Sequence, residues 1–213
     1  MERMATEDTA RILASLEAVP LSELLQQATA MRRAGHGNVI SYSSKVFIPL
    51  TQPCRDVCGY CTFAKAPREV EKPYLSPENV IAIARAGEKA GCREALFTLG
   101  DKPELRYGAA REALNRFGFD TTVDYLEAVC AMVLKETGLL PHVNAGVMDE
   151  QDIARLRKLS VSQGIKLETV SARLGERGGA HFGSRMAKKL NLQESRVVIS
   201  CLYSLTACRP VEF

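Results

Sequence analysis

Three cysteines gather in one short stretch of this chain, at Cys54, Cys58 and Cys61. Their C-x3-C-x2-C spacing directly follows the apolar run 46–50, so the sequence predicts a sulfur-rich loop at the end of a strand. Thiolates are the ligands that soft metal centres and iron–sulfur clusters prefer. Three of them can each hold one iron of a 4Fe-4S cluster. The fourth iron would then keep an open position for a small molecule, as catalytic zinc sites do.

Two alternative roles for these thiols stay open. Zinc prefers four ligands, and the nearest downstream candidates, Cys92 and His142, are far away in the sequence. Alternatively, the three cysteines are buried and inert structural residues. The spacing and the ligand count favour an open iron–sulfur cluster over both.

The composition narrows the class of protein. The 213 residues suffice for one domain or part of a larger one, and no apolar run approaches the roughly 20 residues of a membrane span. A net charge of +3 is too weak to indicate nucleic acid binding. Seven cysteines, an odd number with three clustered, fit a reducing compartment, and the acidic N-terminus does not resemble a secretory signal. We therefore expect a cytoplasmic protein that binds neither nucleic acid nor membranes.

The sequence of residues 1–38 predicts two helices. They are expected to form an N-terminal helical lead-in, which precedes the domain and covers one end of it. Pro20 marks the break between them, and Gly35 and Gly37 are expected to end the second. Each helix has one short apolar stripe, formed by Ile12, Leu13 and Leu16 in the first and by Leu21, Leu24, Leu25 and Ala28 in the second.

Strands and helices are predicted to alternate after residue 45. The predicted strands are 46–50, 95–99, 139–143 and 161–167, and the unbroken first run indicates a strand buried on both faces. Helices are expected from Ser76 with Pro77 in its first turn, near 105–117, from Thr122 and after Asp149. Cys130 falls on the apolar face of the third of these helices and is predicted to pack in the core. Such alternation is typical of α/β chains with parallel βαβ units and right-handed crossovers.

Polar and reactive residues lie at the carboxyl ends of the predicted strands. They are the cysteine triplet, Gly100–Glu104, His142–Asn144 and Glu168. In barrels of βα units the reactive groups lie on the loops after the strands. Four segments far apart in the sequence are therefore expected to converge on one mouth.

Five segments, residues 41–51, 54–63, 94–104, 140–146 and 162–168, carry a resemblance to a known family. The chain resembles the radical S-adenosylmethionine (SAM) enzymes and, within them, the N-terminal half or first subunit of the FO synthase family. The cysteine motif is specific for the superfamily, and the stretch 97–104 narrows the resemblance to the family. It implies a partial (βα) radical SAM barrel of about four parallel strand–helix units over 39–184, after the helical lead-in.

The resemblance also implies chemistry and partners. Cys54, Cys58 and Cys61 would ligate a 4Fe-4S cluster, S-adenosyl-L-methionine would chelate the fourth iron, and its cleavage would yield a 5′-deoxyadenosyl radical. The family's lyase reaction joins a tyrosine-derived fragment to 5-amino-6-(D-ribitylamino)uracil, which gives the deazaflavin FO of coenzyme F420 biosynthesis. The first half catalyses the later radical step, with loss of ammonia. Implied partners are a small-molecule substrate, an electron donor such as flavodoxin or ferredoxin, and the second FO synthase subunit or domain.

Tyr60 occupies the aromatic position of the superfamily motif and would pack on the adenine, unless it fills the core of the loop. Gly100, Asp101 and Glu104 lie where the superfamily contacts the SAM amino group. Asp101 and Glu104 are equally well spaced to form the capping box of a helix start, and the two roles are compatible.

Three further residues receive roles from their position. Glu168 would accept hydrogen bonds from the ribose hydroxyls or the SAM amino group, or else it is a solvated carboxylate. Asn144 is expected to bind the cofactor and His142 to line the mouth as a candidate catalytic residue, although a structural histidine is at least as common. Cys92 is predicted to be buried and inert.

The resemblance ends near residue 184, and residues 185–213 form a tail in which no family pattern is recognised. We therefore expect a truncated chain whose cluster loop is intact and whose substrate binding is incomplete. Two alternatives to FO synthesis remain: an iron–sulfur fragment without turnover, and a radical SAM enzyme with another substrate.

Overall fold

The computed structural model describes residues 14–15, 18–40, 42–164 and 172–182. The chain divides into two compact units, 1–42 and 43–213. The domain boundaries at 38 and 184 stay a prediction. Among the described residues, no helix is long and apolar enough to cross a membrane.

The first unit contains helix α2 (Leu21–His36), which confirms the second predicted helix. It ends at Gly37, whose φ of 58° is in the left-handed region and whose N–H donates to the Arg33 carbonyl at 2.9 Å. Gly35 lies inside the helix, so the expectation that it helps to end α2 is wrong. The predicted stripe at 12–16 falls on residues outside the described ones.

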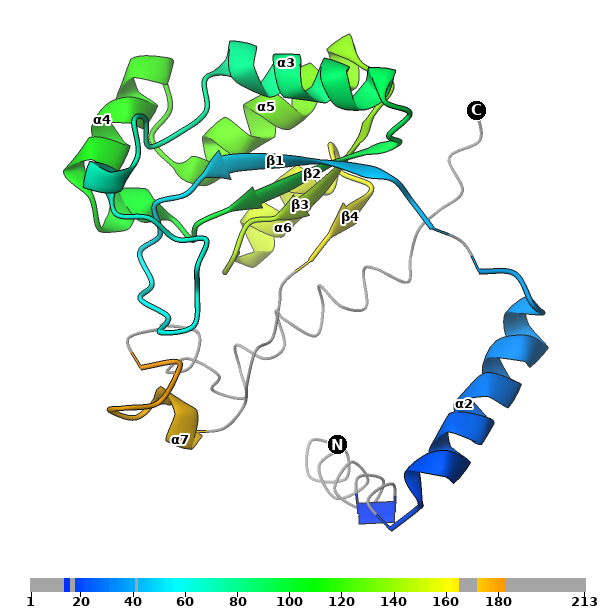
Figure 1. The fold of residues 1–213 in the computed structure, drawn as a ribbon. Helices are drawn as coiled ribbons and strands as arrows, with labels where there is room; N and C mark the ends of the chain where they lie inside the picture. The colour runs from blue at the N-terminus through cyan, green and yellow to red at the C-terminus, as the bar shows by residue number, and fades with distance from the viewer. Residues whose placement is uncertain (1–13, 16–17, 41, 165–171, 183–213) are drawn as a thin grey trace. The chain divides into compact units, whose positions relative to one another are not determined.

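The second unit is built on one parallel sheet, in which the strand order β1-β2-β3-β4 follows the sequence. Figure 1 shows that helices connect each strand to the next along the chain. This arrangement confirms the predicted α/β fold with four parallel strand–helix units. The strands are β1 (Lys45–Thr51), β2 (Glu94–Leu99), β3 (Leu140–Asn144) and β4 (Ser162–Gln163). The helices are α3 (Pro77–Lys89), α4 (Gly108–Phe117), α5 (Thr122–Glu136), α6 (Glu150–Leu156) and α7 (Ala172–Gly175), with 3-10 turns at Pro67–Glu69 and Pro103–Leu105.

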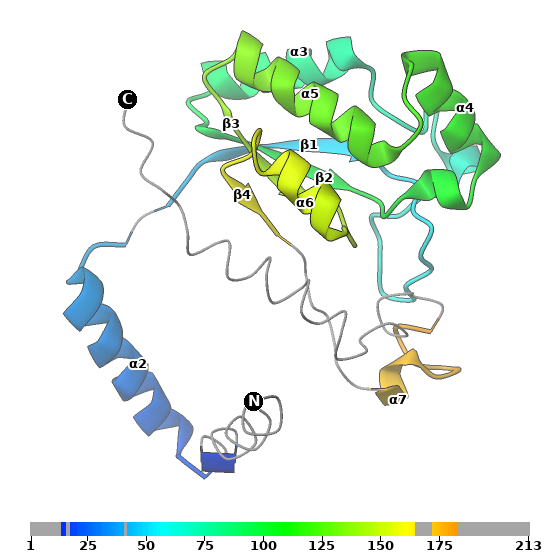
Figure 2. The same cartoon turned by 180° about the vertical axis from the view of Figure 1, so that it is seen from behind.

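Helices α3 and α5 lie over one face of the sheet in both views, and α4 lies beyond the carboxyl ends of the strands (Figures 1 and 2). Helix α3 packs closely on β1, since a Cβ at Gly87 would lie only 2.4 Å from the Cβ of Val46. The core between sheet and helices is apolar and includes Ile48, Phe97 and Leu126, all fully buried. Cys130 is also fully buried in α5, which confirms that it packs in the core.

The other face of the sheet carries a row of residues paired across all four strands: Phe47, Leu96, His142 and Ser162. Phe47 is 49% exposed and the other three are half-buried. The prediction that the first strand is buried on both faces is therefore wrong. The reason is that successive side chains point to opposite faces, and α3 and α5 cover only one of them.

Local capping signals were predicted correctly. Ser76 Oγ accepts a hydrogen bond from the Asn79 N–H at 3.3 Å, and Asp149 Oδ1 accepts one from the Asp152 N–H at 2.8 Å. The fourth predicted strand is present at residues 162–163, and its continuation from 165 lies outside the described residues. The loops that follow β1, β2 and β3 lie at the same edge of the sheet (Figure 1).

Candidate active site

The cysteine loop (residues 52–63) leaves the carboxyl end of β1. Cys54 and Cys58 are half-buried and Cys61 is exposed. The Cys61 N–H donates to the Cys58 carbonyl at 3.1 Å, so the second and third cysteines belong to one closed turn.

The sulfur of Cys54 accepts two hydrogen bonds from backbone N–H groups. Its Sγ accepts hydrogen bonds from the N–H of Asp56 at 3.4 Å and from the N–H of Asp101 at 3.2 Å. Burial raises the pKa of the Cys54 thiol, and these two N–H groups act against that rise because they stabilise the thiolate. Hydrogen bonds to ligating sulfurs are also a means by which proteins tune iron–sulfur clusters.

The loop after β2 (residues 100–107, here the β2 loop) packs directly on the cysteine loop. The Gly100 N–H donates to the Thr51 carbonyl, and the Arg55 N–H donates to the Asp101 carbonyl, both at 3.0 Å. A Cβ at Gly100 would lie 2.0 Å from the Pro53 carbonyl oxygen. Only glycine therefore allows the two loops to approach this closely.

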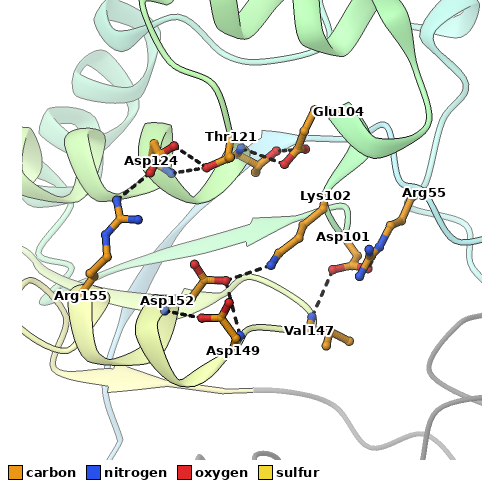
Figure 3. A network of polar contacts seen from close by, with 11 residues as sticks. Arg55, Asp101, Lys102, Glu104, Thr121, Asp124, Val147, Asp149, Asp152 and Arg155 are labelled. Carbon is orange, nitrogen blue, oxygen red and sulfur yellow. Dashed lines mark hydrogen bonds and ion pairs between the residues drawn. The ribbon is translucent and has the colours of Figure 1, made fainter.

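The Asp101 carboxylate joins three loops, as Figure 3 shows. It forms an ion pair with Arg55 from the cysteine loop and accepts a hydrogen bond at 3.2 Å from the Val147 N–H of the loop after β3. A Cβ at Gly146 would lie 2.7 Å from Asp101 Oδ1, so this loop too needs a glycine at the contact. Burial raises the pKa of Asp101, while Arg55 and Val147 oppose the rise.

Lys102 and Glu104 of the β2 loop contact other elements instead (Figure 3). Lys102 has a φ of 33°, which residues with a side chain rarely adopt, and its Nζ contacts Asp152 of α6 at 2.9 Å. Glu104 is buried, and its carboxylate accepts hydrogen bonds from the N–H and Oγ1 of Thr122, at 3.1 and 2.5 Å. It thus caps the amino end of α5 rather than its own turn.

The proposed capping box of Asp101 and Glu104 is wrong. The 3-10 turn that begins at Pro103 has Lys102 at its N-cap position and no side-chain cap hydrogen bond. The physical reason is that both carboxylates have partners on other elements. Whether Gly100, Asp101 and Glu104 also contact a cofactor stays a prediction.

His142 lies inside β3, two positions before its end, on the half-buried face of the sheet. Its Nδ1 is 2.5 Å from Ser162 Oγ and 3.6 Å from Glu94 Oε2. Burial and, to a smaller extent, the Lys45 ammonium lower the pKa of His142. Its contacts with Ser162 and Glu94 lie within the sheet, and whether His142 also lines the mouth as a catalytic residue stays a prediction.

The other predicted residues are distributed as follows. Asn144 is the last residue of β3, and its side-chain amide lies against Gly164, where a Cβ would be 2.6 Å from the end of the amide. Tyr60 is 47% exposed at the tip of the cysteine loop. Cys92 is half-buried and packs against the core. Glu168 lies outside the described residues.

Of the predicted site residues, the structure brings Cys54 together with Gly100 and Asp101, through the contacts between the cysteine loop and the β2 loop.

Sequence reasoning missed Arg55, Lys102 and Thr122, which hold the loops through long-range contacts. Their signal was weak, since each is an ordinary polar residue in a loop or at a helix start.

In the part of the chain that the structure describes, no three metal-ligating side chains lie close enough together to hold a metal ion. The donors nevertheless fit a sulfur-ligated cluster, because three thiols share one loop and one of them already receives two N–H donors.

Comparison with known proteins finds relatives that are named FO synthase. It is 47% identical over 176 residues to the FO synthase of Streptomyces coelicolor, which covers 80% of this chain and 20% of that protein. It is 46% identical over 143 residues to the 7,8-didemethyl-8-hydroxy-5-deazariboflavin synthase of Methanopyrus kandleri, covering 67% of this chain and 43% of that one. The chain therefore spans about one fifth to two fifths of the length of these relatives. No family model matches it.

Solved structures agree on the fold. The [FeFe]-hydrogenase maturase HydG from Carboxydothermus hydrogenoformans matches with a TM-score of 0.60 and 21% identity, over 93% of this chain and 47% of that chain. Methylornithine synthase matches with a TM-score of 0.56 and 20% identity, over 88% and 51% of the two chains. These likenesses concern the arrangement of strands and helices. On the sequence relationship, the chain belongs to the FO synthase family.

Proposed function

We propose that this chain is the cluster-bearing part of a radical SAM lyase of coenzyme F420 biosynthesis. Its reaction would form the deazaflavin FO from a tyrosine-derived adduct of 5-amino-6-(D-ribitylamino)uracil. The observation that carries the proposal is a loop of three cysteines at the carboxyl end of β1, in a chain of FO synthase sequence. That edge of a βα sheet is where such folds hold their reactive groups.

Cys54, Cys58 and Cys61 would each hold one iron of a 4Fe-4S cluster, and S-adenosyl-L-methionine would occupy the fourth. When bound, this group supplies the one-electron cleavage of the sulfonium, which protein side chains cannot perform. The chain's own contribution is to hold the loop. The N–H groups of Asp56 and Asp101 donate to Cys54 Sγ and favour its thiolate form.

The remaining roles concern orientation. The tip of the cysteine loop, with Tyr60, would pack on the adenine of SAM. The backbone around Gly100 would face the SAM amino group, and Asn144 and Glu168 would contribute polar contacts. His142 is the candidate for proton transfer, and the lowered pKa keeps its imidazole neutral near pH 7.

The test is anaerobic reconstitution of the chain with iron and sulfide, followed by assay of 5′-deoxyadenosine formed from SAM. We expect about four irons per chain in the wild type and loss of the brown chromophore in Cys58→Ala. Cys92→Ala is the matched control, since this half-buried thiol packs against the core and should leave iron binding unchanged. A tetrahedral zinc site in protein purified without oxygen would contradict the proposal.

A second candidate is a chain that binds the cluster without forming FO. The observation in its favour is that the chain matches only one fifth of the length of the Streptomyces relative. Adding the FO precursors separates the candidates. Product formation supports the lyase, deoxyadenosine without product indicates another substrate, and a cluster without SAM cleavage indicates an iron–sulfur fragment.

A further inference from the structure

The segment 172–182, here the α7 turn, folds back on itself after helix α7. The His181 N–H donates to the Leu174 carbonyl at 3.0 Å, and the Gly179 N–H donates to the Glu176 carbonyl at 2.9 Å. A Cβ at Gly179 would lie 2.3 Å from the Leu174 carbonyl oxygen, so glycine is needed where the turn closes. The closed turn buries His181, which is only 9% exposed.

This turn contacts the cysteine loop between its second and third cysteines. The Gly59 N–H donates to the Ala180 carbonyl at 2.9 Å. The rings of Tyr60 and His181 meet edge to face, with centroids 4.8 Å apart and planes at 61°. In both overall views, the orange segment lies beside the tip of the cyan loop (Figures 1 and 2).

The cysteine loop is therefore held at two separate places. The β2 loop holds its first part, through Gly100 and Asp101 on the backbone around Cys54. The α7 turn holds its second part, through Ala180 and His181. A loop that must place three thiols around one cluster gains affinity when its conformation is fixed beforehand, because less entropy is lost on binding.

We propose that His181 is a positioning residue for the iron–sulfur site. Its ring holds Tyr60, and with the Ala180 carbonyl it fixes the backbone between Cys58 and Cys61, so that these two thiols are presented together. His181 itself would not ligate iron. The inference rests on the proposed function for its iron-binding consequence, but the contact with the loop exists without metal.

The test compares three variants. His181→Ala removes the ring, His181→Phe keeps an aromatic ring but no ring nitrogen, and His36→Ala is a control at an exposed histidine of α2. Two quantities are measured for each: deuterium exchange at the Gly59 amide in the iron-free chain, and the rate at which a chelator removes iron from the reconstituted chain. Thermal unfolding of the iron-free variants checks that each is folded.

We expect His181→Ala to speed both Gly59 exchange and iron loss by about five-fold, the effect of one edge-to-face ring pair. His181→Phe should stay within about two-fold of the wild type, because it keeps the ring contact. Unchanged exchange and iron loss in His181→Ala would overturn the inference. Loss of iron in both variants would also overturn it, since the imidazole nitrogen would then be needed as a ligand.

Failure of the inference can be told apart from failure of the proposed function. If the wild type takes up no iron, the proposed function fails, while the exchange of the Gly59 amide still reports whether His181 orders the loop. If the wild type binds iron and His181→Ala behaves like it in both measurements, only the positioning role fails.

Discussion

Asp101 provides the sharpest test of how the site is built, because its carboxylate connects three loops. Asp101→Ala removes the ion pair with Arg55 and the hydrogen bond from the Val147 N–H. The side chains of Arg55 and Asp101 are only 13% and 9% exposed. The substitution therefore leaves a largely buried guanidinium without its carboxylate and a backbone donor without its acceptor.

Removing one partner of a buried ion pair costs about 3–5 kcal/mol, since the remaining charge stays in a poorly solvated place. We take about 3 kcal/mol for Asp101→Ala, because the guanidinium keeps some contact with water. A chain of this size loses about 2–4 °C in Tm per kcal/mol, so Tm should fall by about 6–12 °C. Asp101→Asn keeps the shape and an oxygen for the Val147 N–H and should cost about half as much.

The coupling between the two charges also predicts the behaviour of the double variant. In Arg55→Met/Asp101→Ala neither charge of the pair is left buried without its partner, and the loss should shrink to about 1 kcal/mol. The pair is thus costly to break but worth little compared with an apolar replacement, in agreement with the burial that raises the Asp101 pKa.

The assays are urea unfolding and thermal unfolding of the reduced, iron-free chain, both followed by circular dichroism at pH 7. Asp120→Ala is the matched control, because this exposed aspartate precedes α5 and should change stability by less than about 0.5 kcal/mol. The buried pair is refuted as the cause if Asp101→Ala unfolds like the control. It is equally refuted if the double variant loses the sum of the two single losses, because the residues would then not be coupled.

Three further predictions concern the same sheet edge and face. Gly100→Ala should lower the free energy of unfolding by about 3 kcal/mol in urea, because the new Cβ meets the backbone of the cysteine loop. Gly35→Ala has free space in α2 and should raise it by about 0.5 kcal/mol, and equal effects of the two substitutions would contradict the close approach at Gly100. Glu104→Ala should lose about 2 kcal/mol in the same assay, since it uncaps α5, and a loss below about 0.5 kcal/mol would argue against this cap. Burial and Lys45 lower the pKa of His142 below 6.5, so the unfolded state binds the proton more readily and stability falls as the pH drops below about 6.5. His142→Gln should therefore lose less stability than the wild type between pH 7 and pH 5, and identical pH profiles would show that His142 does not contribute.

The sequence was sufficient for features that depend on a few neighbouring residues. The alternation of apolar runs predicted four parallel strands, and Ser76 and Asp149 predicted helix starts, because a cap and its donor lie within one turn. The periodicity of α5 placed Cys130 in the core. The spacing of the three cysteines predicted a thiol loop at the end of β1, and the structure has them there.

The tertiary structure alone decided how that loop is held. Asp101 and Glu104 suggested a local capping box, but Asp101 pairs with Arg55, 46 residues away, and Glu104 with Thr122, 18 residues away. The register of β3 with β4 likewise places His142 beside Ser162, a partner that spacing along the chain does not reveal. Propensity and spacing describe neighbours along the chain. Partners across the sheet edge are selected by the packing of separate strands, and a buried carboxylate takes whichever donor that packing brings within reach.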